Sequence, residues 1–222
     1  MFRAETKEAT PILQNALAAL LKAVPTRGRS GSDLRTACGN LSANAEILIA
    51  TDLVGPPLVN CFDLAITAGA THNHFAYVRS KTLVENPVTI GATLVKNSII
   101  NLSLAYECDA IGGMTFVSRE DVDQLKLAMN AVFNDAEEVA ADDMDQESYR
   151  VLVELHAALM FHLIETARPL PRMLRFRFAA PMATLVTAQR LYYDASRADE
   201  LREENKVVHP AFMLPTGRAL SA

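Results

Sequence analysis

Cysteine is scarce in this chain: its 222 residues include only three, at positions 38, 61 and 108. Their number is odd, and none of them forms a Cys-x-x-Cys pair. We therefore expect reduced, buried thiols in a chain made in the cytoplasm.

Long apolar runs are also missing. The first ten residues, MFRAETKEAT, contain no apolar core of a signal peptide, so no secretory signal is expected. The most apolar window, residues 88–114, is interrupted by Lys96, Asn97, Asn101 and Glu107. This pattern predicts a buried helix in the protein interior and not a membrane span.

Sequence motifs of catalysis and phosphate binding are absent as well. The chain has no Gly-x-Ser-x-Gly and no Gly-x-x-x-x-Gly-Lys, and residues 27–31 form only a short basic loop. The net charge of −5 argues weakly against a broad nucleic-acid-binding face. We therefore expect neither a nucleic-acid partner nor a membrane partner.

Two groups of histidines allow a metal-site interpretation. One is His72 and His74 in the stretch Thr-His-Asn-His, and the other is His156, His162 and Glu165 on a predicted helix. A metal site needs matching ligands from other segments, and none occurs at suitable spacing. We favour a polar loop or helix end for the first group. For the second we favour a core or interface role for His156 and a surface pair between His162 and Glu165.

Helical periodicity dominates the first two thirds of the chain, in which many apolar positions are alanine. Helices are predicted over residues 8–24, from a cap at Ser32 to about Asp52, and over residues 58–78. Residues 25–31 are predicted to be a loop, and Gly55-Pro56-Pro57 is expected to stop the second helix. A further helix should start near Asn86-Pro87 and end at Gly112-Gly113 with a left-handed glycine cap.

A helical hairpin is the clearest pattern in the sequence. Ser118 and Asp121 resemble a capping box, and apolar residues follow at three- and four-residue spacing up to Val139. A second helix is predicted over residues 146–167. The link over residues 142–145 is so short that the two helices should run antiparallel.

Charge is unevenly distributed around this hairpin. Residues 119–154 contain eleven acidic and three basic residues, a local net charge of −8, whereas residues 168–177 contain four arginines and no acid. One interpretation is a solvated acidic helix face and a basic edge. The other is a pair of complementary docking surfaces for neighbouring subunits.

The pattern changes after the hairpin. Arg175-Phe176-Arg177-Phe178 alternates with a period of two, which predicts a strand. Short helices should follow over residues 181–191 and 197–205, and a last strand over residues 218–222. The predicted fold is mainly α: an Ala-rich helical body with a long antiparallel hairpin over residues 1–168, then a small α+β (βααβ) domain over residues 172–222.

This C-terminal region resembles a LysM module. The resemblance is carried by Thr184-Leu185, Ala188, Leu191-Tyr192, Arg197, Leu201, Asn205, His209-Pro210, Leu214-Pro215, Gly217 and Leu220. It implies that Leu185, Ala188, Leu191 and Leu201 are buried against a two-stranded sheet. Asn205 should then bridge backbone groups where the second helix turns away.

A segment of this region is also similar to the C-terminal part of the Mu-like phage DNA circularisation proteins, which are tail and baseplate components. The segment is residues 191–212, LYYDASRADELREENKVVHPAF. That resemblance spans about residues 118–222. LysM modules that bind peptidoglycan carry Gly-Asp-Thr-Leu after the first strand, whereas this chain has Met182-Ala183-Thr184-Leu185. Loss of the polar residues that face the glycan favours protein docking over sugar binding.

The resemblance implies a structural protein of a phage tail, located in the virion at the baseplate or the tube–baseplate junction after synthesis in the host cytoplasm. It would form a homo-oligomeric ring and dock on tube, hub or wedge proteins, with no enzymatic activity, cofactor or metal. The candidate partner-binding residues are Arg175, Arg177, Tyr192, Tyr193, Arg197 and His209. The alternatives are a peptidoglycan-binding LysM adaptor protein and a metal-dependent hydrolase that uses the histidine-bearing helix.

Overall fold

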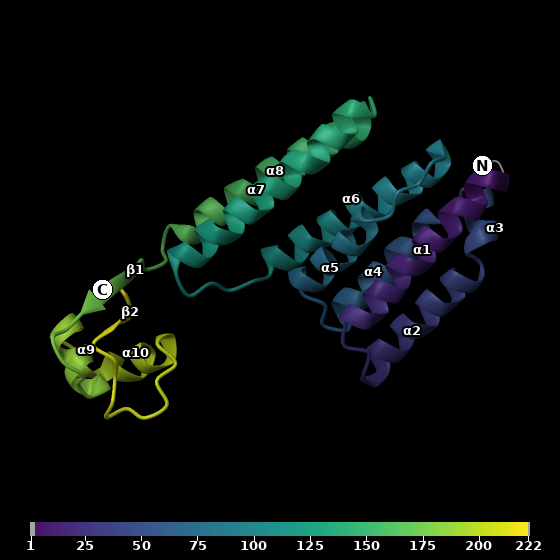
Figure 1. The fold of residues 1–222 in the computed structure, drawn as a ribbon. Coiled ribbons are helices and arrows are strands. Elements are labelled where there is room, and N and C mark those ends of the chain that lie inside the picture. Colours follow the sequence, from purple (N-terminus) through teal and green to yellow (C-terminus); the bar gives the residue numbers. More distant parts are fainter. Residues whose placement is uncertain (1–2, 222) are drawn as a thin grey trace. The chain divides into compact units, whose positions relative to one another are not determined.

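The computed structural model describes residues 3–221 and is mainly helical, with a small antiparallel sheet (Figure 1). It divides into two compact units, one up to Met114 and one from Thr115 onward. The first unit contains α1 (Arg3–Ala23), α2 (Gly28–Ala43), α3 (Ala45–Ala50), α4 (Gly55–Thr67), α5 (His72–Leu83) and α6 (Ile90–Gly112). The second contains α7 (Arg119–Asp142), α8 (Gln146–Ala167), β1 (Met173–Arg177), α9 (Thr184–Tyr192), η1 (Ala195–Arg197), α10 (Ala198–Glu204) and β2 (Thr216–Leu220).

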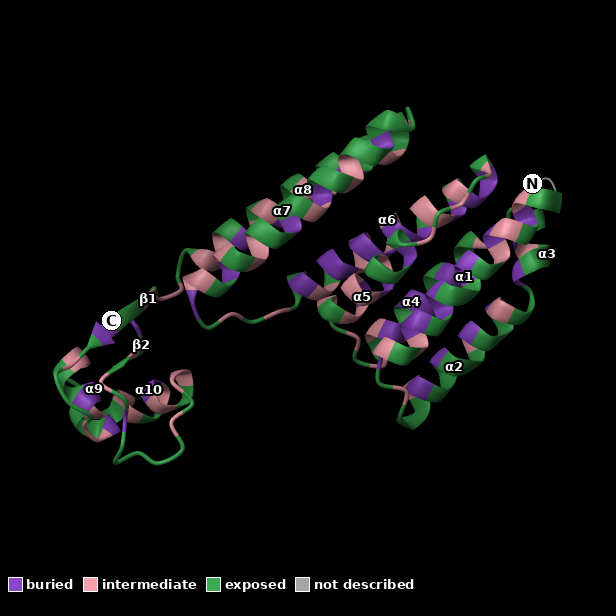
Figure 2. Cartoon of the chain, viewed as in Figure 1, coloured by how far each residue is buried: buried purple, intermediate pink, exposed green. Residues whose placement is uncertain are grey.

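The core of the first unit forms around α1, which packs against α2, α3, α5 and α6. Its apolar residues recur at helical spacing, so Ile12, Leu13 and Leu20 all lie on the buried face (Figure 2). Phe62 of α4 and Phe75 of α5 stack with ring centroids 5.7 Å apart. Burial of these side chains is the main stabilising contribution to the unit.

Several predicted helix boundaries in this unit are wrong, mostly because glycine and proline were interpreted only as breakers. Residues 28–31, predicted to be a loop, form the first turn of α2. Gly31 lets the backbone of Thr26 approach this turn closely, since an added Cβ would lie 2.7 Å from Thr26 Cα. Gly55-Pro56-Pro57 starts α4, since proline suits the first helical turn. The predicted helix over residues 58–78 is two helices, separated near Gly69 at φ +90°.

The predicted end of the next helix is correct in position but wrong in conformation. α6 ends at Gly112, yet its cap residue Gly113 has φ −91°, in the ordinary right-handed region. The beginning of α6 is fixed from α1: the Glu8 carboxylate accepts hydrogen bonds from the Val88 N–H at 2.6 Å and the Thr89 N–H at 2.9 Å. The Thr89 hydroxyl donates a third hydrogen bond to the same carboxylate. Together the three bonds lower the pKa of Glu8, and the hydroxyl contributes most.

A buried ion pair joins α5 to α6. Arg79 Nε lies 3.1 Å from Glu107 Oε2, and the two side chains are only 13% and 4% exposed. Burial raises the pKa of the neighbouring Cys108 thiol to about 12, and the charge of Glu107 adds to the effect. All three cysteines are free and buried, as predicted.

The hairpin of the second unit confirms the prediction closely. Ser118 Oγ accepts a hydrogen bond from the Asp121 N–H, and the Asp121 carboxylate accepts one from the Ser118 N–H, which completes a capping box. α7 and α8 then run side by side in opposite directions (Figure 1). Their contact buries a stripe that includes Phe133, Leu152 and Leu159.

The terminal module, residues 172–221, follows the hairpin. β1 and β2 pair antiparallel, with Phe176 opposite Gly217, and the helices between them bury Ala188 and Leu201. Leu185 was predicted to be buried here, but it is 59% exposed. The first turn of α9 instead directs Thr184, Thr187 and Ala188 inward, so Leu185 lies on the solvent side.

The sequence placed a domain boundary between residues 168 and 172, whereas the compact units divide before the hairpin. Hydrogen bonds cross the predicted boundary. The Arg119 N–H donates to the Pro171 carbonyl at 3.0 Å, and the Met173 N–H donates to Glu120 Oε2 at 2.6 Å. The first turn of α7 is therefore tied directly to the start of β1.

We predict that Arg79→Ala will destabilise the chain by about 3–5 kcal/mol, because it leaves the carboxylate of Glu107 buried without a partner. Urea denaturation followed by circular dichroism measures the loss. The double variant Arg79→Met with Glu107→Leu should lose clearly less, because no charge remains buried. Equal losses in the two proteins would contradict this account of the ion pair.

Candidate functional site

The two arginines of β1 lie on the outer face of the sheet. Phe176 points into the core of the terminal module, and strand alternation places Arg175 and Arg177 on the opposite side. Both side chains are exposed. They are therefore free to meet a partner.

Tyr192 and Arg197 are used inside the module. The Arg197 guanidinium carbon lies 3.8 Å from the centroid of the Tyr192 ring, and its Nε and Nη2 contact the Glu200 carboxylate at 3.1 and 2.7 Å. Both residues are half-buried, and burial raises the pKa of Tyr192. This stacked and ion-paired cluster holds the end of α9 against η1 and α10.

Tyr193 and His209 lie on the surface. Tyr193 ends α9 in the left-handed region at φ +59° and is 87% exposed. His209 is exposed, accepts a hydrogen bond from the Ala211 N–H at 3.2 Å and contacts the Phe212 ring at a centroid distance of 5.3 Å. The six predicted residues therefore form an internal pair and two outward groups. No described contact joins Tyr193 or His209 to the other four.

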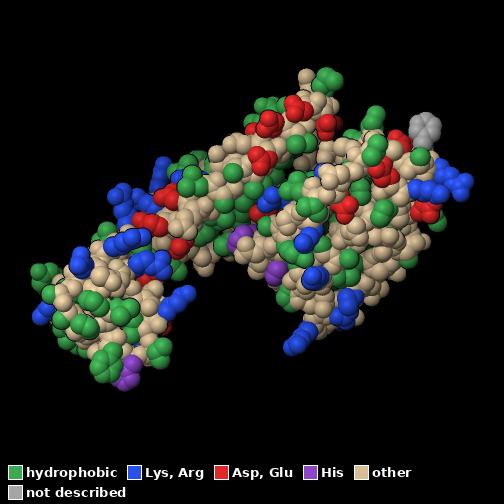
Figure 3. Space-filling model, viewed as in Figure 1, with side chains coloured by type: hydrophobic (Ala, Val, Ile, Leu, Met, Phe, Trp, Pro, Cys, Tyr) green, Lys and Arg blue, Asp and Glu red, His purple; other side chains and the backbone are tan. Residues whose placement is uncertain are grey.

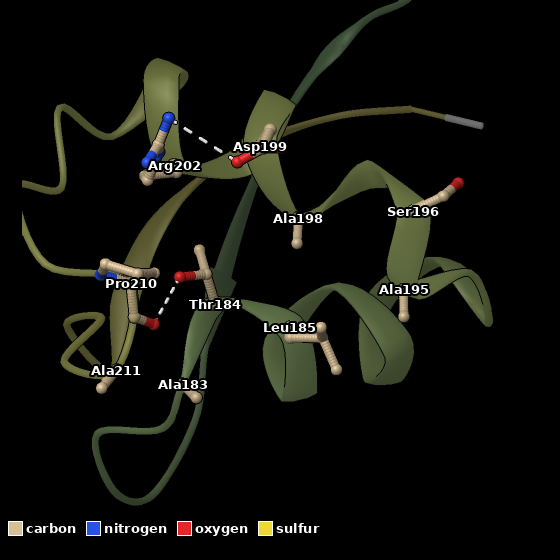
Figure 4. A pocket seen from close by; sticks show the side chains of 10 residues that line it. All are labelled: Ala183, Thr184, Leu185, Ala195, Ser196, Ala198, Asp199, Arg202, Pro210 and Ala211. Atoms are coloured by element: carbon tan, nitrogen blue, oxygen red, sulfur yellow. Dashed lines mark hydrogen bonds and ion pairs between the residues drawn. The ribbon is translucent and has the colours of Figure 1, made fainter.

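An open pocket of about 500 Å³ lies on the terminal module (Figure 4). Three segments form it: the start of α9, the stretch from η1 into α10, and the loop at Pro210 and Ala211. The Pro210 carbonyl accepts bonds from the Thr184 N–H at 2.7 Å and the Thr184 hydroxyl at 2.5 Å. This pair of hydrogen bonds fixes the distance between two walls of the pocket.

Exposed apolar side chains accompany the pocket. Leu185 lines it, and the loop that supplies Pro210 and Ala211 also exposes Val208, Phe212 and Leu214, with Phe212 75% exposed. We call these four residues the apolar rim. Sequence reasoning missed the rim because it assigned Leu185 to the core. The apolar residues around His209-Pro210 were the available signal, since a solvent-exposed loop gains nothing from them.

Asn205 closes the module at the end of α10. Its Nδ2 donates to the carbonyls of Leu201 at 2.8 Å and Arg218 at 2.7 Å, and its Oδ1 accepts from the Arg218 N–H at 2.7 Å. The predicted backbone-bridging role of Asn205 is confirmed. Gly217 leaves room for this contact, because an added Cβ there would lie 2.6 Å from a Phe176 ring carbon.

Two of the histidines outside the module, His74 and His156, have structural partners. His74 Nδ1 accepts from the Thr71 N–H at 3.0 Å at the start of α5. His156 stacks on Phe133 at 4.6 Å and bonds Glu137 at 2.9 Å, which agrees with the predicted core role.

The predicted surface pair of His162 and Glu165 is wrong. Glu165 pairs with Arg168 at 3.0 Å, and His162 Nε2 is buried without a hydrogen-bond partner. One helical turn brings the guanidinium of Arg168 within reach of Glu165, and the stronger charge pair forms. Within residues 3–221, no three His, Cys, Asp or Glu side chains gather closely enough to hold a metal ion.

A scan against protein-family models and a search of curated proteins return no match to this chain. Among the helices of the described region, none combines the length and apolar character that a bilayer crossing requires.

We predict that Asn205→Ala will destabilise the terminal module by about 1–3 kcal/mol, because three hydrogen bonds are lost at once. Asn205→Asp keeps the acceptor for the Arg218 N–H but turns a carboxylate oxygen toward the Leu201 and Arg218 carbonyls, so it should not restore the stability. Amide hydrogen exchange at β2 measures the effect. Unchanged protection of the Arg218 N–H in Asn205→Ala would contradict the bridging role.

Proposed function

We propose that the chain is a structural component of a bacteriophage tail that docks on neighbouring tail proteins through its terminal module. The baseplate or the tube–baseplate junction is the proposed location. The observation that carries the proposal is the apolar rim beside an open pocket on a small module whose own core is complete without it.

The architecture of the module supports the LysM-like resemblance, while the tail assignment rests on the similarity to the Mu-like phage proteins. The element order is strand, helix, helix, strand, and the two strands pair antiparallel. Asn205 has the role that the resemblance implies for the asparagine after the second helix: it lies at the end of that helix and holds the final strand. These features agree with a scaffold that presents its loops to a partner.

The proposed docking face surrounds the pocket. Leu185 and Phe212 offer apolar area, while Tyr193 and His209 combine area with a directional polar group, as is common at protein interfaces. Tyr192 and Arg197 support this face from inside through their mutual contact. Substitution of Arg197 would therefore disturb the module itself and is a poor test of docking.

We predict that Phe212→Asp will leave the chain folded but reduce its incorporation into tails by about tenfold or more, because a charge would replace an apolar anchor. Mass spectrometry of purified particles measures incorporation, and electron microscopy shows whether tails are complete. Leu127→Asp is the matched control, since Leu127 is an equally exposed apolar residue on α7. Normal particles from Phe212→Asp would count against the proposed docking face.

A peptidoglycan-binding adaptor is the second candidate, and the pocket is the observation that favours it. Its walls come from the segment after β1 and the segment after α10, the two places that the LysM-like resemblance assigns to glycan contact. Thr184, Asp199 and Arg202 supply polar groups there.

Co-sedimentation with purified sacculi at moderate salt separates the two candidates. Under the adaptor hypothesis the chain binds saturably, and Ala195→Trp abolishes binding because the indole fills the pocket. Under the docking proposal no saturable binding occurs.

A further inference from the structure

One edge of the two-stranded sheet is open. In the ladder, the Phe178 N–H bonds the Pro215 carbonyl at 2.6 Å and the Ser221 N–H bonds the Arg172 carbonyl at 2.7 Å. Alternate residues of an antiparallel strand face opposite edges, so Arg175 and Arg177 direct their N–H and C=O groups away from β2. Within residues 3–221 no acceptor meets either N–H.

The neighbouring edge positions are already occupied, and they show which chemistry fits. At the start of β1, the Met173 N–H is taken by the carboxylate of Glu120 at 2.6 Å. On β2, the backbone of Arg218 is taken by the side chain of Asn205. The open stretch is therefore confined to Arg175 and Arg177, next to a carboxylate that already binds the same edge.

Charge makes this stretch a positive surface in which donors outnumber the two backbone carbonyls. Arg175 stands opposite Arg218 across the ladder, and Arg218 is neutralised by Glu204 at 3.1 Å. Arg175 and Arg177 have no acidic partner among the described residues. Two guanidinium groups beside two free N–H groups match carboxylates and repel a second β1 strand, which would bring arginine against arginine.

The chain carries matching carboxylates at the far end of its own hairpin. Asp135, Glu138 and Asp142 recur at three- and four-residue spacing on α7, and all three are exposed without a basic partner in the described region. The last turn of α7 contains no basic residue, so Asp142 lies at the negative end of the helix dipole, where it destabilises its own helix. Figure 3 shows acidic side chains gathered along this hairpin and basic ones near β1.

The two surfaces cannot meet within one molecule. Glu120, in the first turn of α7, is bonded to Met173 at the start of β1, whereas Asp142 is the last residue of the same helix. A helix of 24 residues is about 36 Å long. The acidic stripe thus lies about 22–33 Å along the helix from Glu120 and the start of β1.

We propose that copies of this chain associate head to tail, with the acidic stripe of one copy (Asp135, Glu138 and Asp142) seated on the open β1 edge of the next (Arg175 and Arg177). Such a heterologous contact closes into a ring or continues as a filament. The partner of the β1 edge is thus a second copy of the chain. The proposed tail function supplies only the place where this contact would form.

Sedimentation velocity on the purified full-length chain tests the contact. We expect the wild type to form species larger than a dimer as its concentration rises, and the dissociation constant to increase about tenfold or more from about 50 to about 500 mM NaCl as salt screens the charges. Two neutralised variants, Arg175→Gln/Arg177→Gln and Glu138→Gln/Asp142→Asn, should each be monomeric. Mixed together they should form a heterodimer that grows no further, because one intact surface remains on each.

Matched controls separate this contact from other effects. Arg190→Gln/Lys206→Gln removes the same charge elsewhere in the terminal module and should assemble like the wild type. Arg175→Lys/Arg177→Lys should restore part of the assembly. Phe212→Asp, which tests tail docking, should leave self-association unchanged, so the two proposals fail separately.

The proposal is overturned if the wild type stays monomeric across the concentration range at low salt. It is equally overturned if either neutralised variant assembles like the wild type, or if the mixture behaves as the sum of its two monomers.

Discussion

The contact between Asn205 and the backbone of Arg218 is the constraint on which the terminal module depends. Two hydrogen bonds of the Asn205 amide join the end of α10 to Arg218 of β2, a third holds the amide to the Leu201 carbonyl, and Gly217 gives them room beside the Phe176 ring. The contact fixes where the chain leaves α10 and therefore where the loop with Pro210 and Ala211 lies. It also occupies the backbone of Arg218 on the outer edge of β2, whereas Arg175 and Arg177 of β1 keep N–H groups without a partner among the described residues.

This arrangement sorts the arginines and tyrosines of the module into two roles. Arg197 stacks on Tyr192 and pairs with Glu200, which closes the helical layer over the sheet. Arg175 and Arg177 face outward on a strand whose inner face carries Phe176. The same residue types thus stabilise the module in one place and offer donors to a partner in another, and burial distinguishes the two.

Local sequence patterns predicted the hairpin well and the first unit less well. The hairpin rests on near-neighbour chemistry: a capping box at Ser118 and Asp121, helical spacing, and a link too short for anything but an antiparallel return. In the first unit, Gly31 acts through the Thr26 backbone beside it in space and Pro56 lies in the first turn of α4, so their apparent role as breakers was misleading. Leu185 was assigned to the core by the LysM-like resemblance, but the side of this short helix that carries Leu185 faces solvent.

The sequence by itself determined the helical content, the two closing strands and the free thiols, because each follows from residue type and short-range spacing. The bridging role of Asn205 was implied by the LysM-like resemblance, and its partner Arg218 lies 13 residues further along the chain. The sequence also supplied the uneven charge along the hairpin and the arginines that follow it. Only the tertiary structure decided that Tyr192 and Arg197 face each other, that Leu185 and Phe212 face solvent, and that β1 keeps an open edge. Those outcomes depend on which groups far apart in the chain compete for the same neighbour, and no local pattern contains that information.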